Sequence, residues 1–89
     1  MKQAMKEMLQ EFIERDFTAN EMEIVKSAIA VVVQDYKMIA LYRKHDNVEM
    51  VLKYKYELRN DMLDLRDQLD NLGLTYKAKD LVDDGGVEL

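Results

Sequence analysis

Apolar residues recur at spacings of three and four along most of this chain, the pattern of helices that bury one face. Within 19–44, one series of apolar positions comprises Met22, Val25, Ile29, Val32, Tyr36 and Ile39. A second series lies beside it and comprises Ile24, Ala28, Val31, Asp35, Met38 and Tyr42. The run 27–34 is therefore apolar on nearly every side, and such a helix must be covered on nearly every side.

The ends of the helices must be set by capping residues, because the chain has no proline and its first glycine is Gly73. Thr18 followed by Glu21 has the spacing of a capping box, which predicts a helix that begins after Thr18. Asp46 followed by Glu49 repeats this spacing and predicts a second helix start. Gly73 can adopt the left-handed conformation that ends a helix in a Schellman motif.

The predicted fold is all-α, with helices over about 1–16, 19–44 and 47–72 in a single domain of residues 1–74. The tight link between the second and third helices makes them an antiparallel hairpin. This hairpin covers only one apolar face of 19–44, so the first helix or a second copy of the chain, in a helical-bundle dimer, must cover the other. Residues 75–89 are predicted to be either a short helix capped by Thr75 or a mobile acidic tail. The valine run 31–33 also has strand propensity, so a buried strand is the competing interpretation.

Length and composition favour a small protein that associates with itself. A chain of 89 residues without cysteine forms a thin core that no disulfide reinforces. The first residues include charges where a signal peptide is apolar, and no run approaches the roughly 20 apolar residues of a membrane span. We therefore expect a soluble, cytoplasmic protein that does not bind membranes.

Charge is distributed unevenly along the chain. Residues 36–59 contain six basic and three acidic residues, a formal charge of +3, whereas the whole chain carries −5. Tyrosines interleave with the basic residues, an arrangement that can bind single-stranded nucleic acid. The candidate nucleic-acid-binding residues are Arg43, Lys44, Lys53 and Lys55. The acidity of the remaining chain opposes this interpretation, and basic residues at a helix C-terminus also simply offset the helix dipole.

The acidic residues suggest two further interpretations. Asp61, Asp64, Asp67 and Asp70 could imitate a phosphate backbone and block a nucleic-acid-binding protein, but their three-residue steps drift around the helix, so a solvated helix face explains them better. Glu11 and Glu14 are one turn apart, but the helical pattern places them on an outer face, unsuited to a metal site. His45 has no nucleophile nearby in the sequence. We expect no catalytic residue, metal or cofactor, and therefore no enzyme.

The sequence predicts a small acidic helical protein-binding module, a regulator, inhibitor or adaptor that acts through protein-protein contacts as a homodimer or higher oligomer. The predicted self-association residues are Ala28, Val31, Val33 and Met38. The predicted partner-binding residues are Met5, Met8, Phe12 and Asp35, because methionine side chains adapt to varied surfaces. Asp35 interrupts an apolar series, where a polar residue can fix register, and could pair with Arg59, with Lys55 or with a partner's basic residue.

Overall fold

The computed structural model describes the backbone of residues 3–88 and the side chains of residues 3–84. Its four helices are α1 (Gln3–Glu14), α2 (Ala19–Lys44), α3 (Val48–Asn71) and α4 (Ala78–Glu88). The prediction of an all-α chain is confirmed. Within residues 3–88 there is no strand, so the alternative of a strand at 31–33 is wrong.

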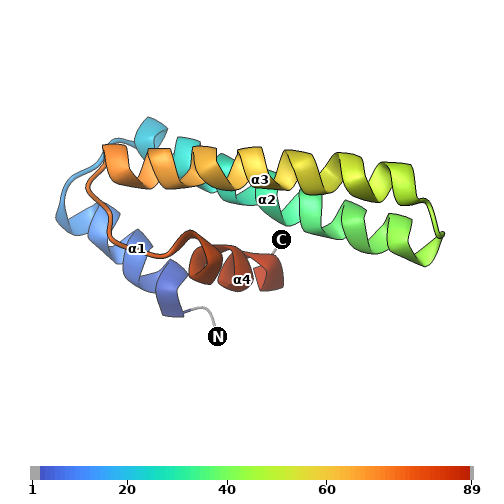
Figure 1. The fold of residues 1–89 in the computed structure, drawn as a ribbon. Coiled ribbons are helices and arrows are strands. Elements are labelled where there is room, and N and C mark those ends of the chain that lie inside the picture. Colours follow the sequence, from blue (N-terminus) through green and yellow to red (C-terminus); the bar gives the residue numbers. More distant parts are fainter. Residues whose placement is uncertain (1–2, 89) are drawn as a thin grey trace.

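Helices α2 and α3 pack closely against each other as a long hairpin, as the sequence predicts (Figure 1). The hairpin gives the molecule its elongated shape of 46 × 24 × 19 Å. Both α1 and α4 lie beside the open end of the hairpin (Figure 1). We call this part of the molecule the base; it comprises α1, α4 and the hairpin residues outside 36–59. Residues 36–59, which we call the arm, extend beyond α4 to the turn between α2 and α3.

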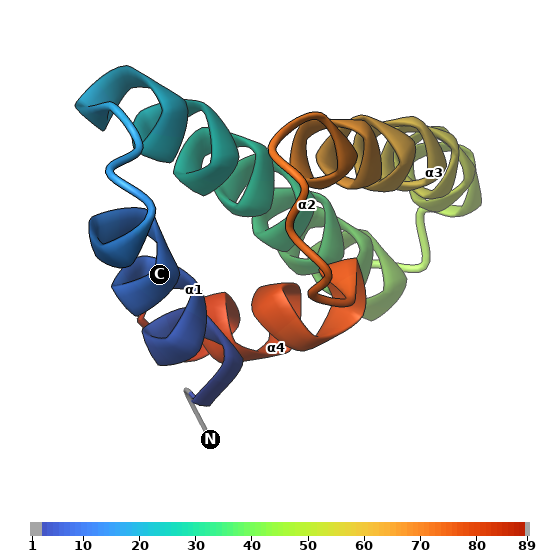
Figure 2. The same ribbon diagram turned by 90° about the vertical axis from the view of Figure 1, so that its left-hand side faces the viewer.

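Helix α4 joins the parts of the base. It contacts α1, α2 and α3, and in the view of Figure 2 it spans from the hairpin to α1. Its residues Ala78, Leu81 and Val82 are buried. Of the two predictions for 75–89, the helix is therefore the one observed, although it begins at Ala78 and not directly after Thr75. Helix α4 packs on α2 at Val33, which lies outside the second apolar series that we expected α1 or another copy to cover.

The hydrophobic core lies in the base. Its buried residues are Met8, Phe12, Val25, Ile29, Val32, Val33, Leu65, Leu69, Leu74, Ala78, Leu81 and Val82. In the arm, Ile39 is the one buried apolar side chain among the residues described. The arm is thus a two-helix projection whose side chains remain largely accessible to other molecules.

Two predicted helix ends are confirmed in atomic detail. Thr18 Oγ1 accepts a hydrogen bond from the Glu21 amide at 3.1 Å, and Glu21 Oε1 accepts one from the Thr18 amide at 2.9 Å. Gly73 has a φ of +68°, and the Leu74 amide donates to the Leu69 carbonyl at 2.9 Å. These are the capping box and the Schellman motif that the spacing predicts.

The predicted cap at Asp46 is wrong by one residue. Asp46 adopts a φ of +54°, and the Asn47 amide donates to the Tyr42 carbonyl at 2.9 Å, so Asp46 ends α2 in a Schellman motif. The side chain of Asn47 instead caps α3, because it accepts from the Met50 amide at 3.2 Å. Asp16, with a φ of +56°, ends α1 in the same way, which explains why α1 stops at Glu14 and not at Asp16.

Candidate interaction surfaces

An uncharged strip runs along the exposed side of α2. It consists of Ile24, Ser27, Val31, Gln34, Met38 and Leu41, whose spacings of three and four place them on one side of the helix. Ile24, Val31 and Leu41 are 44%, 48% and 44% exposed. In a chain of which 35% is charged, this strip carries no charge over 18 residues, or about 26 Å of helix. We call it the neutral strip.

The predicted self-association residues divide between the two sides of α2. Val31 and Met38 belong to the neutral strip, and Ala28 is partly buried next to the core. Val33 is two residues from Val31 and therefore points to the other side, where it shares a buried cluster with Val82 of α4. Packing within the chain thus covers Val33 and leaves Val31 accessible.

The predicted partner-binding residues of α1 lie mostly inside the core. Met8 is 0% exposed and Phe12 is 1% exposed, whereas Met5 is partly buried. The ring of Phe12 packs edge to face on that of Phe17, with the centroids 5.0 Å apart. The chain itself therefore covers the proposed methionine surface, a result that depends on α4 and that the α1 sequence does not reveal.

Asp35 is 4% exposed, and its Oδ2 is buried without a hydrogen-bond partner. The carboxyl group faces acidic residues of α3, and neither Arg59 nor Lys55 is its partner. Burial is the largest cause that raises the pKa of Asp35, and together with a hydrogen bond to Asp61 and the negative charges of Asp61 and Glu57 it brings this pKa to about 7. Asp35 is therefore protonated over part of the pH range in which other aspartates are charged.

The register of the hairpin explains this unexpected partner. If the residues of α2 and α3 paired symmetrically about the turn at His45 and Asp46, Asp35 would lie opposite residue 56 of α3. In the structure its partner is Asp61, five residues further along α3. Tyr42 shows the same offset: symmetric pairing would place it opposite residue 49, but its ring stacks on that of Tyr54, with the ring centroids 5.8 Å apart. Both offsets have the direction expected for helical side chains, which lean toward the N-terminus of their own helix.

The arm brings all four candidate nucleic-acid-binding residues to one end of the molecule. Arg43, Lys44, Lys53 and Lys55 are exposed there. The Nζ atom of Lys53 lies 5.5 Å from the centroid of the Tyr54 ring. Since Tyr54 already stacks on Tyr42, the more open rings of the arm are those of Tyr36 and Tyr56.

A groove of about 250 Å³ also lies in the arm. Its lining residues are Arg43, Asp46, Asn47, Val48, Val51, Leu52 and Lys55. Val48 and Leu52 are 68% and 60% exposed, and Tyr56, one turn after Leu52, is 70% exposed. The groove thus combines apolar side chains with a basic rim, a composition typical of sites that bind proteins.

Asp84 has a role that the sequence did not suggest. Its Oδ2 accepts hydrogen bonds from the backbone amides of Ala4, at 2.7 Å, and Met5, at 3.2 Å. A residue 80 positions away thereby satisfies two amides at the start of α1, and its charge lies where the helix dipole favours an anion.

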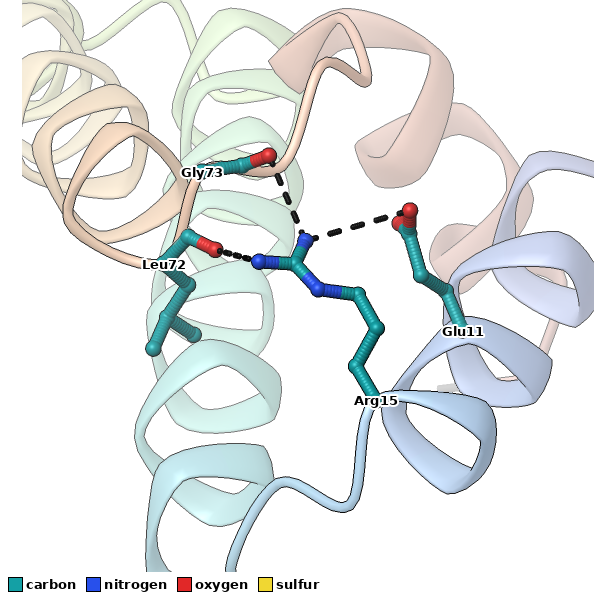
Figure 3. Close-up of polar contacts among 4 residues, drawn as sticks. All are labelled: Glu11, Arg15, Leu72 and Gly73. Carbon is teal, nitrogen blue, oxygen red and sulfur yellow. Dashed lines mark hydrogen bonds and ion pairs between the residues drawn. The ribbon is translucent and has the colours of Figure 1, made fainter.

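The other end of α1 is tied to α3 through Arg15 (Figure 3). Its Nη2 donates to the Leu72 carbonyl at 3.0 Å and its Nη1 to the Gly73 carbonyl at 3.4 Å. Glu11 Oε1 lies 3.9 Å from the same Nη1. Arg15 therefore occupies the C-terminal end of α3, where a cation offsets the helix dipole.

We expect Asp84→Ala to lower the free energy of unfolding by about 1–2 kcal/mol, because two amides of α1 lose their shared acceptor. Asp84→Asn, which keeps an acceptor oxygen but loses the charge, should cost less than half as much. Urea denaturation followed by circular dichroism measures both variants. Equal losses in the two variants would contradict a capping role.

Within residues 3–84, no three His, Asp or Glu side chains are grouped so that they could hold a metal ion. None of the four helices described combines the length and apolar composition that a membrane crossing requires. Comparisons of the chain with protein-family models, curated proteins and solved structures give no significant match.

Proposed function

We propose that this protein is a non-enzymatic helical interaction module that forms a homodimer and binds another protein, as a regulator, inhibitor or adaptor. The neutral strip of α2 is the observation that carries the proposal. Apolar side chains aligned over several turns and free of charge are typical of helices that pair with helices. The arm groove is a second surface, on which an acidic segment of a partner protein would find apolar contacts and basic residues.

Solution mass across a dilution series tests the homodimer. We expect the wild type to approach twice the 10.5 kDa of one chain at high concentration, and Val31→Lys to remain monomeric because it places a charge in the middle of the strip. Leu63→Lys is the matched control, since Leu63 is similarly exposed, at 46%, but lies on α3. Circular dichroism checks that both variants fold. A wild type that remains monomeric at high concentration would refute the proposal.

Binding of single-stranded nucleic acid by the arm is the second candidate function. It is favoured by the exposed basic side chains and the open Tyr56 ring of the arm, and opposed by the net charge of −5. Titration of a labelled oligonucleotide at low and moderate salt separates the two functions. Steeply salt-dependent binding that is lost in Lys53→Ala with Lys55→Ala, and retained in Lys6→Ala with Lys79→Ala, would support it. An absence of binding at low salt would eliminate it.

A further inference from the structure

The neutral strip has a symmetry that specifies how a second copy would bind. Ile24, Val31 and Met38 are spaced seven residues apart, and Val31 stands near the middle of α2 (Ala19–Lys44). A twofold axis perpendicular to the helix near Val31 would place Ile24 of each copy opposite Met38 of the other. The two α2 helices would then overlap along nearly their whole length.

Nothing described in the structure covers this side of α2. Helix α4 packs against the opposite side, through Val33 and Val82. Between the strip and α3 lies Asp35 of α2, whose carboxyl group faces Glu57 and Asp61 of α3. A second α2 could therefore approach without displacing α1 or α4.

The charge distribution selects the orientation of the two copies. The arm carries a formal charge of +3, which leaves −8 for the rest of the chain. An antiparallel pair places the arm of each copy beside the base of the other, whereas a parallel pair places arm beside arm and base beside base. Opposite charges therefore meet in the antiparallel pair, and like charges meet in the parallel pair.

Exposed residues of α3 that flank the strip follow the same distribution. Glu57 faces Asp35. Lys53 lies four residues before Glu57 and Asp64 lies seven residues after it, so all three are on the same side of α3. Lys53 belongs to the arm and Asp64 to the base, and both are exposed. An antiparallel partner would bring the basic end of one flank toward the acidic end of the other.

We propose that two copies of the chain associate through their neutral strips, with the α2 helices antiparallel about a twofold axis near Val31. This arrangement rests on the homodimer proposed above and specifies its geometry. It leaves the grooves of the two arms at opposite ends of the dimer, each accessible to a partner.

Single-cysteine variants can test the geometry directly, because the chain has no cysteine of its own. We expect a short bis-maleimide to cross-link Val31→Cys efficiently to itself. Ile24→Cys and Met38→Cys should each fail alone, because 14 residues of helix separate the two copies of each thiol by about 21 Å. Mixing these two variants should produce the cross-linked heterodimer. Leu63→Cys, exposed on α3, reports random collisions.

The outcomes distinguish the arrangement from the homodimer itself. Efficient cross-linking of all three strip variants to themselves would indicate a parallel pair, which overturns the arrangement but retains the homodimer. A mass of two chains without cross-linking at the strip beyond the Leu63→Cys level would also overturn it, because the interface would lie elsewhere. A monomeric mass without cross-linking would refute both proposals.

Discussion

Asp35→Asn is expected to stabilise the protein by about 2–4 kcal/mol at pH 8. Folding moves the Asp35 carboxyl from water to a buried position beside Asp61 and Glu57, which raises its pKa from 3.8 to about 7. A shift of this size costs the folded state up to about 4 kcal/mol when the group must ionise. Asparagine has nearly the same shape, carries no charge and can donate a hydrogen bond to Asp61.

The pH dependence has a defined sign and range. Because the pKa is raised in the folded state, the folded protein binds a proton that the unfolded chain releases as the pH rises above 3.8. The stability contributed by Asp35 is therefore highest at the acid end and is lost as the pH rises from about 4 to about 7. Asp35→Asn should lack this loss, so the two proteins should differ most in stability above pH 7.

Urea denaturation at pH 5, 6, 7 and 8, at one fixed protein concentration, measures this effect. Asp64→Asn is the control, since Asp64 is an exposed aspartate one turn from Asp61 and its replacement should change stability by less than about 0.5 kcal/mol. If Asp35→Asn and Asp64→Asn gave the same dependence on pH, the burial and acidic surroundings of Asp35 would not determine its ionisation.

The features that the sequence predicted correctly are set by local interactions. A capping box needs only Thr18 and Glu21, and a Schellman motif needs a residue such as Gly73 that tolerates a positive φ. The hairpin follows from a tight turn between two long amphipathic segments. At Asp46 and Asn47, either residue suits a helix cap, and which of them ends α2 depends on a conformation that spacing does not determine.

Long-range contacts account for the features that the sequence missed. The segment 80–86 is acidic and contains two glycines, so its local preferences favour a mobile tail over a helix. It is helical in the folded chain, where Leu81 and Val82 enter a core made by other helices and Asp84 caps α1. The acidic partner of Asp35 was missed because it depends on the offset between α2 and α3, which helical spacing alone does not give.

Leu81→Ala is expected to lower the free energy of unfolding by about 2–5 kcal/mol, the usual cost of emptying a core site. Leu81 is 0% exposed and belongs to α4, which contacts each of the other three helices. Because α1 packs mainly on α4, loosening α4 should also loosen α1, whereas the α2–α3 pairing in the arm should persist. Urea denaturation measures the first effect, and amide hydrogen exchange of the individual helices measures the second.

Leu63→Ala provides the matched control for Leu81→Ala, since it removes the same atoms from a side chain that is 46% exposed on α3. We expect it to cost less than about 1 kcal/mol and to leave hydrogen exchange in α1 unchanged. A Leu81→Ala protein that loses stability but keeps full protection of α1 would show that Arg15 and the short link between α1 and α2 suffice to hold α1. A loss in Leu81→Ala no larger than in Leu63→Ala would show that α4 contributes little to the core, because an exposed tail loses nothing when a leucine is shortened.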